Sequence, residues 1–358
     1  MNTTRISLRT AFFFLLAAGT VTLAGCVVAT ESDENVFEED TSSSSDAILN
    51  GTSVTEKYPE GATIDIGTSP LCSGTLIAPM VVLTAGHCIM GPTTLTVKVG
   101  AESRTTTGSA VYDWTAGSSK NPAQHDVALL FLNKPIWLRW YPTIEQTAVP
   151  ANTPVTNVGR MHNGPTSTLW GADVYDLNYG TMINAAPPYS GTFAFDYWAS
   201  NVLEPGDSGG PVFIKDTHRI IAVNSAFGTL GNGKQIGLFA RVDLLHAWIT
   251  QQIATHPAPA PTNAQISCVF NWAEVAYSNL FAPAVQQPLQ SSPPFVYRYY
   301  PGTNSYLGAA WASASAPHQG VASPSSTYPV KHVFFMDSTG IPQDQGTVGY
   351  WMKQANCL

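Results

Sequence analysis

Charged side chains are scarce in this sequence: aspartate, glutamate, lysine and arginine together make up only 11% of its 358 residues. Basic residues are the fewer, 16 against 24 acidic ones, so the formal net charge is −8. Proteins that bind nucleic acid need a surplus of positive charge for the phosphates, so this deficit argues against such a partner. With 44% hydrophobic residues, the chain as a whole is also too apolar to stay disordered.

Cysteines are few, and their number, five, is odd. No Cys-x-x-Cys or His-x-x-x-His spacing occurs, so metal binding is the weaker explanation, and we expect neither a metal nor another cofactor. An odd cysteine in an exported protein needs an explanation of its own, which Cys26 supplies below. The other four make two natural pairs: Cys72 with Cys88 around a short hydrophobic segment, and Cys268 with Cys357 around the C-terminal region.

The apolar run near the N-terminus is too short to span a bilayer comfortably. "AFFFLLAAGTVTLAG" follows Arg5 and Arg9, and a positive start before an apolar run predicts a signal peptide over residues 1–25. The run ends in "LAGC", which resembles the lipobox of bacterial lipoproteins, in which the cysteine, here Cys26, receives a lipid. The alternative is an ordinary signal peptide that happens to be cleaved near a cysteine.

Residues 26–47 form an acidic, serine-rich segment that we interpret as a solvated spacer and propeptide. Its run "TESDENVFEED" carries the carboxylates Glu31, Asp33, Glu34, Glu38, Glu39 and Asp40. The N-terminal features together predict an exported protein, either a bacterial outer-membrane or cell-surface lipoprotein or one that is secreted after cleavage. Its contact with a membrane would be made only through the lipid anchor.

From residue 48 onward, short apolar runs alternate with Gly, Pro, Ser and Asn, which is typical of an all-β barrel or sandwich. "RVDLLHAWITQQIATH" breaks this pattern and predicts an amphipathic helix that closes a domain at residue 256. Its apolar face would consist of Leu244, Leu245, Trp248, Ile249 and Ile253. "PAPAPT", residues 257–262, cannot continue a helix and predicts a stiff linker.

Residues 263–358 differ in composition and predict a small α+β domain stapled by the pair Cys268–Cys357. "FVYRYYPGTNSYLG" predicts a hairpin, "VKHVFFM" another strand, and "GYWMKQANC" a closing helix. "NWAEVAYSNLF" predicts a helix with an apolar face of Trp272, Val275, Ala276 and Leu280.

Three motifs between residues 48 and 256 carry candidate chemistry: "TAGHC" with His87, "DVALL" with Asp126, and "GDSGGP" with Ser208. Each alone has an ordinary structural explanation, since Asp, Ser and Gly are common turn residues. In this order they resemble the chymotrypsin-like (trypsin-like) serine endopeptidase family, whereas subtilisin-like and α/β-hydrolase enzymes use other orders. The resemblance covers residues 48–256 and includes the first cysteine pair. It implies a double six-stranded β-barrel with a C-terminal helix.

The resemblance also implies a reaction, the hydrolysis of peptide bonds in proteins or peptides. Ser208 would be the nucleophile, His87 the base that takes its proton, and Asp126 the acid that orients the imidazole. The N–H groups of Gly206 and Ser208 would form the oxyanion hole. Ser225 matches a family serine that hydrogen-bonds this aspartate; the alternative is an ordinary serine at the end of a strand.

An activation step is implied as well, because proteolysis in this family frees a new N-terminus whose ammonium pairs with the acid before the catalytic serine. "ILNG" at Ile48 matches that terminus, with Leu49 in place of the usual Val, and Asp207 is the acid. We therefore expect a zymogen that another protease cuts after Ala47, which is not the usual basic residue. The alternative is that "ILNG" is only a first strand.

The residue at the base of the primary pocket would be Val202, where trypsin-type enzymes carry Asp. A buried Lys or Arg would find no partner there, so we expect apolar substrate residues at P1, the position before the cleaved bond. Gly237 matches a pocket-wall glycine, and Phe227 lies near the entrance. Glu204 stands where the family has a cysteine that braces the pocket loop.

The C-terminal region resembles a module at the ends of other exported bacterial proteins. Its aromatic residues could contact a cell surface or polymer, or could simply fill a core. They are Tyr297, Tyr299, Tyr300, Tyr306 and Trp311. A function of a different class is also open: a surface-anchored binding protein with a protease-like scaffold. Such scaffolds usually lack a triad member, whereas this sequence has all three.

Overall fold

A computed structural model describes residues 48–358 except residues 50, 90–93, 116–122, 161–167, 181–192, 282–287, 293–294 and 314–328. The described residues all belong to one compact unit. The predicted signal peptide, the acidic spacer, Ala47 and Cys26 lie outside them. Among the described residues, no helix is long and apolar enough to cross a membrane.

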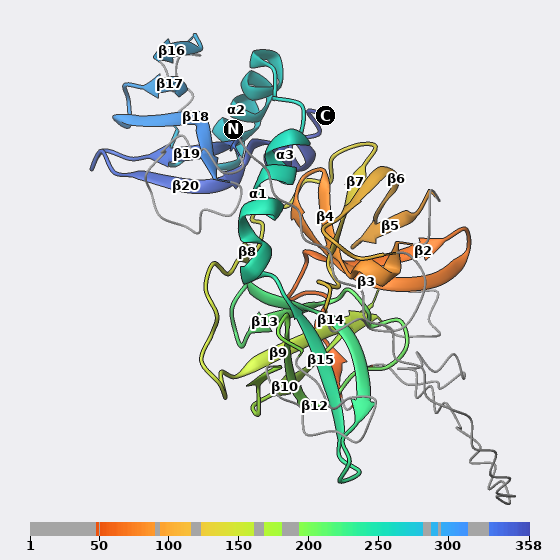
Figure 1. Cartoon of the computed structure of the whole chain (residues 1–358). Helices are drawn as coiled ribbons and strands as arrows, with labels where there is room; N and C mark the ends of the chain where they lie inside the picture. The colour runs from red at the N-terminus through yellow and green to blue at the C-terminus, as the bar shows by residue number, and fades with distance from the viewer. Residues whose placement is uncertain are drawn as a thin grey trace, which may run out of the picture. The chain divides into compact units, whose positions relative to one another are not determined.

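The strands between residues 61 and 132 form a closed six-stranded barrel, which confirms the predicted all-β class (Figure 1). Its neighbours run in the order β2-β3-β4-β7-β6-β5, and every pairing is antiparallel. The strands are β2 (Gly61–Ile66), β3 (Ser69–Ala78), β4 (Val81–Thr84), β5 (Thr96–Val99), β6 (Glu102–Val111) and β7 (Ala128–Leu132). All five residues of β7 are buried, which explains why "ALLFL" is a continuous apolar run rather than an alternating one.

The strands between residues 143 and 241, together with a short strand at residues 52–53, form a nine-stranded, barrel-like sheet in the order β1-β10-β9-β13-β14-β15-β12-β11, with β8 paired to β14. Six strands were expected here. The described pairings form an open path, and three short strands raise the number: β1 and β11 at its two ends and β8 beside β14. The strands are β1 (Thr52–Ser53), β8 (Thr143–Ile144), β9 (Val155–Arg160), β10 (Leu169–Val174), β11 (Asn178–Tyr179), β12 (Asp196–Ser200), β13 (Pro211–Ile214), β14 (Arg219–Thr229) and β15 (Gln235–Arg241).

The helix predicted after the second sheet begins later than expected. Asp243–Leu245 form a 3₁₀ turn, η2, and α1 runs from His246 to Thr255. Leu245, Ile249 and Ile253 are buried as predicted, but Leu244 is 44% exposed. In a 3₁₀ turn successive side chains are spaced more widely around the axis than in an α-helix, so Leu244 leaves the apolar face.

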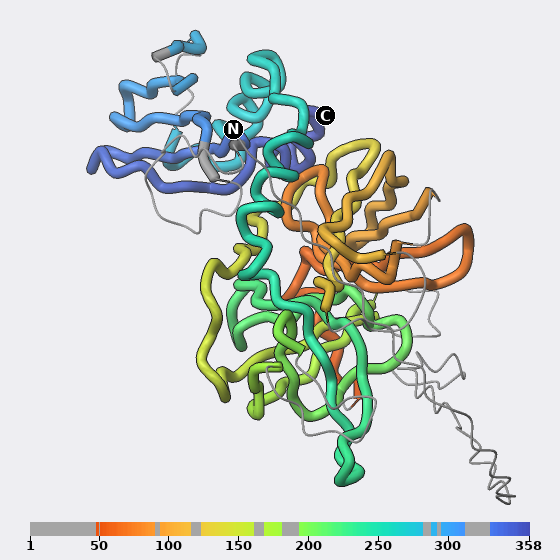
Figure 2. Tube along the Cα trace, viewed as in Figure 1, coloured from red at the N-terminus to blue at the C-terminus, as the bar shows by residue number. Residues whose placement is uncertain are grey.

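The C-terminal region has the predicted α+β class. A five-stranded antiparallel sheet in the order β16-β17-β18-β19-β20 packs against two helices. The strands are β16 (Gln290–Ser292), β17 (Phe295–Tyr300), β18 (Ser305–Ser313), β19 (Pro329–Met336) and β20 (Pro342–Thr347), and the helices are α2 (Asn263–Ala276) and α3 (Val348–Gln354). The trace in Figure 2 runs from α1 through residues 257–262 directly into α2.

The face predicted for α2 is wrong. Val275 is 79% exposed, and Leu280 lies beyond the helix end; the buried side is formed by Ile266, Val269, Phe270 and Ala273. A capping box between Thr262 and Gln265 starts the helix directly after the prolines, before the segment from which the face was predicted.

Both predicted disulfides are present, Cys72–Cys88 and Cys268–Cys357. The first joins β3 to the 3₁₀ turn η1 (Gly86–Cys88), and the second joins α2 to the chain end after α3. Each therefore links two elements that lie apart in the sequence, by 16 and 89 residues.

The α3 end of the C-terminal domain packs on the connection between β7 and β8. Thr347 Oγ1 donates to the Leu138 carbonyl (2.7 Å), and the Thr347 N–H donates to the Arg139 carbonyl (3.2 Å). Gly349 lies so close to Trp137 that a Cβ there would be 2.0 Å from its ring. These hydrogen bonds and the close packing at Gly349 join the C-terminal domain to the segment that follows β7.

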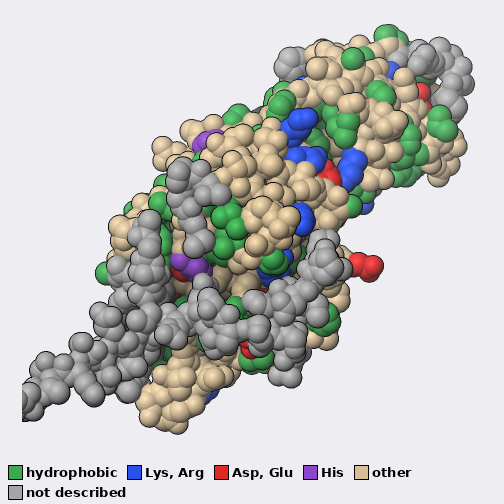
Figure 3. Space-filling view, turned by 90° about the vertical axis from the view of Figure 1, so that its right-hand side faces the viewer, with side chains coloured by type: hydrophobic (Ala, Val, Ile, Leu, Met, Phe, Trp, Pro, Cys, Tyr) green, Lys and Arg blue, Asp and Glu red, His purple; other side chains and the backbone are tan. Residues whose placement is uncertain are grey.

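The surface reflects the composition. On the face drawn in Figure 3, charged side chains are few, and most of the lysines and arginines gather in one area.

The close approach at Gly349 gives a first prediction. Gly349→Ala should destabilise the chain by about 1–3 kcal/mol, because the added methyl must displace the Trp137 ring. The measurement is denaturant unfolding followed by tryptophan fluorescence. Gly308→Ala in β18 is the matched control, since its nearest neighbour would be 3.9 Å away. Equal stability of the two variants would contradict the packing described.

Candidate active site

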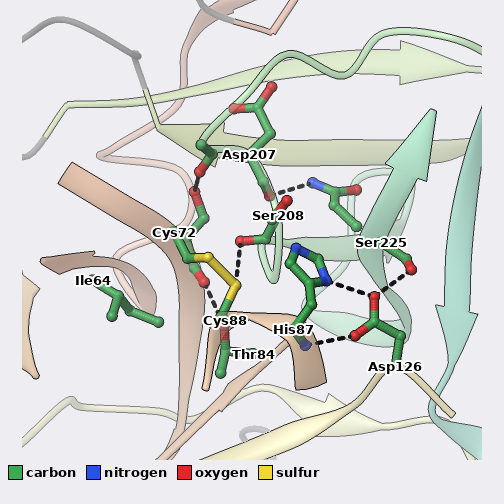
Figure 4. Close-up of a disulfide and its surroundings, with 12 residues drawn as sticks. Ile64, Cys72, Thr84, His87, Cys88, Asp126, Asp207, Ser208 and Ser225 are labelled. Atoms are coloured by element: carbon green, nitrogen blue, oxygen red, sulfur yellow. Dashed lines mark hydrogen bonds and ion pairs between the residues drawn. A yellow bond between two sulfur atoms is a disulfide. The ribbon is translucent and has the colours of Figure 1, made fainter. Parts of the chain in front are cut away.

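His87 lies on the short turn η1, directly after the buried strand β4. The turn needs glycine at position 86, where a Cβ would lie 2.8 Å from Trp114. Cys88 ties the other side of His87 to β3 through its disulfide (Figure 4). The side chain of His87 is thus held from both neighbouring residues.

Asp126 precedes β7 and is buried. Its carboxylate accepts a hydrogen bond from the His87 N–H at Oδ1 (2.9 Å) and another from the Ser225 hydroxyl at Oδ2 (2.5 Å). His87 Nδ1 lies 2.7 Å from the same Oδ2 (Figure 4). A neutral imidazole held this way carries its proton on Nδ1, which leaves Nε2 as an acceptor on the opposite side of the ring.

Ser208 lies in the turn before β13, next to the imidazole of His87 in Figure 4. The turn is narrow because two glycines follow. Gly209 has a φ of 79°, and a Cβ there would lie 2.1 Å from Thr84 Oγ1. The strand pairing that follows starts at Pro211, so the buried Ser208 stands three residues before the sheet.

Gly206 also has a left-handed backbone, with a φ of 96°. Its carbonyl accepts a hydrogen bond from Ser73 Oγ (2.9 Å), and the Ser208 carbonyl accepts one from the Ser73 N–H (2.8 Å). Ser73 Oγ itself accepts from the Arg160 N–H (2.9 Å). Ser73 thus fixes the carbonyls of Gly206 and Ser208. Fixing these carbonyls limits the directions in which the N–H groups of the loop can point.

The carboxylate of Asp207 has fewer hydrogen-bond donors than that of Asp126. Its side chain is 0% exposed, and Oδ2 accepts from the Glu204 N–H (2.9 Å), but among the described residues Oδ1 has no hydrogen-bond partner. Burial raises the pKa of this carboxyl well above its usual value. Gly159 makes the room, since a Cβ there would lie 2.1 Å from Oδ1.

Ile48 is only 1% exposed, so the beginning of the described chain is inserted into the protein. The Leu49 N–H donates to the Val202 carbonyl (2.9 Å), which places this segment against the loop that leads to Asp207. The arrangement brings the predicted new terminus and the loop of its predicted partner together.

The residues predicted for the substrate pocket gather around β14 and β15. Phe227 is paired with Gly237 in the ladder, and both Val202 and Phe227 pack against one apolar cluster. A Cβ on Gly237 would lie 2.9 Å from the Phe239 ring, so the wall is crowded by an aromatic side chain. The cluster against which they pack consists of apolar side chains. Glu204 contributes its N–H to Asp207 in place of a disulfide brace.

A group of Cys72, His87 and Cys88 has atoms close enough to hold a metal ion. Both cysteines are consumed by the disulfide, which removes them as thiolate ligands. These residues therefore do not fit a metal site.

Sequence reasoning missed Ser73 and Arg160. Neither stands in a motif, and their role depends on two barrels meeting. The only signal was that Ser73 follows Cys72, whose partner is next to His87.

Comparisons with known proteins point to one family. A sequence model of the family described as "Trypsin" matches residues 49–249. "Chymotrypsin-like elastase family member 1" of Bos taurus is 27% identical over 221 residues, which cover 52% of this chain and 79% of the relative. The protein of the same name from Rattus norvegicus is 27% identical over 219 residues, which cover 51% of this chain and 79% of the relative. Among solved structures, mouse neuropsin, "a serine protease expressed in the limbic system of mouse brain", matches with a TM-score of 0.50 and 20% identity over 57% of this chain and 100% of that one.

The state of Asp207 gives a second prediction. A buried carboxyl with a raised pKa binds its proton more tightly in the folded than in the unfolded chain, where it ionises near pH 4. The intact protein should therefore lose stability as the pH rises above about 4. Asp207→Asn should remove this loss, so the variant should melt at a higher temperature than the intact wild type at pH 8 and at a similar one at pH 4. A variant that melts lower at both pH values would show that the carboxyl has an unseen partner.

Proposed function

The chain belongs to the trypsin family and is a chymotrypsin-like serine endopeptidase, and on this premise we propose that Ser208, His87 and Asp126 form its catalytic triad. The single observation that carries the proposal is the carboxylate of Asp126, which receives the N–H and Nδ1 of His87 together with the Ser225 hydroxyl. Such a carboxylate orients the ring and stabilises its protonated form.

In the proposed reaction, Ser208 Oγ attacks the peptide carbonyl carbon while His87 Nε2 accepts the hydroxyl proton. The carbonyl oxygen becomes an oxyanion, which accepts hydrogen bonds from the N–H groups of Gly206 and Ser208. When the C–N bond breaks, His87 returns the proton to the leaving amine and an acyl-enzyme forms. Water then attacks that ester by the same route, the acid product leaves, and Ser208 regains its proton.

We propose that the intact chain is a zymogen. The support is the buried Asp207 oxygen without a described partner, together with the buried Ile48 and the contact of Leu49 with Val202. Cleavage after Ala47 would create an ammonium at Ile48, and a buried ammonium and a buried carboxylate need each other. Ala47 is not basic, so the activating protease would prefer small or apolar residues.

Export and release are proposed from the order of features. Cys26 would carry the lipid, and cleavage before Ile48 would separate the active enzyme from its anchor, because Cys26 lies upstream. A mature, active enzyme that is still joined to Cys26 would contradict this release.

For the C-terminal domain, residues 263–358, we propose contact with a cell surface or polymer. Residues alternate along β17, so Tyr300 faces α2, where its hydroxyl bonds to Glu274, while Tyr297 and Tyr299 face the other way. Tyr299 and Tyr306 have ring centroids 4.6 Å apart. Tyr297, Tyr299 and Tyr306 are each only partly buried. Tyr300 thus has the structural role considered above, whereas Tyr297, Tyr299 and Tyr306 form an aromatic row.

The nucleophile gives a third prediction. A fluorophosphonate probe should label Ser208 in the activated enzyme and only weakly in the intact chain, because the oxyanion loop is completed by activation. Ser208→Ala should abolish labelling, whereas Ser225→Ala should keep it, since that serine only orients Asp126. Absence of labelling both before and after limited proteolysis would favour the alternative function, a surface binding protein on a protease-like scaffold.

The pocket gives a fourth prediction. We propose apolar P1 residues, because a Lys or Arg side chain beside Val202 would be buried without a carboxylate. On a peptide library, cleavage after Ala, Leu or Phe should exceed cleavage after Arg in kcat/KM, and Val202→Asp should shift the preference toward Arg by about tenfold or more. Faster cleavage after Arg by the unchanged enzyme would refute the assignment of Val202.

A further inference from the structure

A second histidine–aspartate pair lies next to the proposed triad. The His125 N–H donates to Asp113 Oδ1 (2.8 Å), and His125 Nδ1 lies 2.8 Å from Asp113 Oδ2. His87 holds Asp126 with the same pattern, at 2.9 and 2.7 Å. Because His125 directly precedes Asp126, one peptide bond links the two pairs.

The His125 ring is fixed by packing as well. It is stacked on Phe195 with centroids 3.9 Å apart, and the edge of Tyr112 approaches it at 5.1 Å. Tyr112 in turn contacts Trp248 of α1 at 5.7 Å. The ring is therefore packed against the turn that precedes β12 and, through Tyr112, against the closing helix, although its own residue precedes β7 of the first barrel.

The backbone at Asp126 is fixed from both sides. The His125 N–H is bound by Asp113, and the His125 carbonyl accepts from the Val127 N–H (2.8 Å). The peptide planes that flank Asp126 therefore have little freedom to rotate, and the direction of its side chain follows from them.

The same short segment also reaches the triad histidine. Trp114, the neighbour of Asp113, packs on Gly86, and its ring centroid lies 6.3 Å from that of His87. Residues 112–114 thus contact both His125 and His87, and a shift of Asp113 would change the position of both histidines.

We propose that His125 and Asp113 are a positioning pair, which holds the Asp126 backbone so that its carboxylate meets His87 in line with Ser208. The inference rests on the triad proposed above. Neither residue touches substrate; the pair acts through Asp126. A misplacement of about 1 Å at a catalytic group can lower the rate by about 10²-fold, so small shifts of this backbone matter.

Two variants separate the hydrogen bond from the packing. His125→Asn keeps an amide N–H where Nδ1 lies and can still donate to Asp113, but loses the ring that stacks on Phe195. His125→Leu keeps apolar bulk against Phe195 but has no donor. The two are compared as activated, full-length enzymes, and kcat is calculated per active site titrated with fluorophosphonate, so that misfolded protein does not count.

With a positioning role, His125→Leu should lower kcat about 10–100-fold and leave KM within about twofold, because substrate binding is untouched. His125→Asn should stay within about threefold of wild type in kcat. If His125→Leu cannot be prepared in folded form, Asp113→Asn takes its place. It leaves the stacked ring intact but removes one of the two acceptors, and it should also lower kcat with KM unchanged.

A higher kcat for His125→Leu than for His125→Asn would show that the ring serves packing alone and would overturn the proposal, as would wild-type kcat in His125→Leu or Asp113→Asn. Absence of fluorophosphonate labelling of the wild-type enzyme itself would instead refute the proposed function, and the positioning role would fall with it.

Discussion

A carboxylate that is removed from water needs donors or a cation around it, and this constraint shapes the centre of the molecule. Two acids are buried where the barrels meet. Asp126 has its donors in place, from the backbone and ring of His87 and from Ser225. Asp207 has one, from Glu204, and an oxygen left without a partner in the described part of the chain. The Asp126 carboxylate thus has its hydrogen-bond donors in place, whereas the Asp207 carboxylate, next to Ser208, does not.

The meeting of the barrels is itself held by polar groups. Ser73 of the first barrel bonds to carbonyls at both ends of the segment Gly206–Ser208, and Arg160 of the second sheet donates to Ser73. The Arg160 guanidinium is buried with Asp65 of the first barrel at 2.8 Å. The loop Gly206–Ser208 therefore depends on contacts far from it in sequence, which is a physical reason for the candidate site to lie where the first barrel meets the second sheet.

The sequence predicted the parts of this site that are local. His87, Asp126 and Ser208 stand in short motifs, and both cysteine pairs follow from their positions, so these could be found without a fold. The helices were predicted less well. The prediction that Leu244 is buried was wrong because a 3₁₀ turn changes the spacing of the side chains. The prediction of the apolar face of α2 was wrong because the cap at Thr262 sets the start of the helix. His125 and Asp113 were missed because no spacing rule says which loop residue faces a histidine 12 positions away. Such contacts are fixed by tertiary packing against Phe195 and Tyr112.

The central claim is that the intact endopeptidase is nearly inactive until cleavage after Ala47 creates an ammonium group at Ile48, which pairs with Asp207. The most direct measurement uses Ala47→Arg, which lets trypsin cut before Ile48, with N-terminal sequencing and hydrolysis of an apolar-P1 peptide recorded before and after the cut. The account predicts little activity in the intact variant and a rise of about 10²-fold or more once Ile48 is the first residue, as expected when an oxyanion donor is brought into place. It predicts no such rise in the double variant with Asp207→Asn. Full activity of the intact chain, or equal activation without the Asp207 carboxylate, would contradict it.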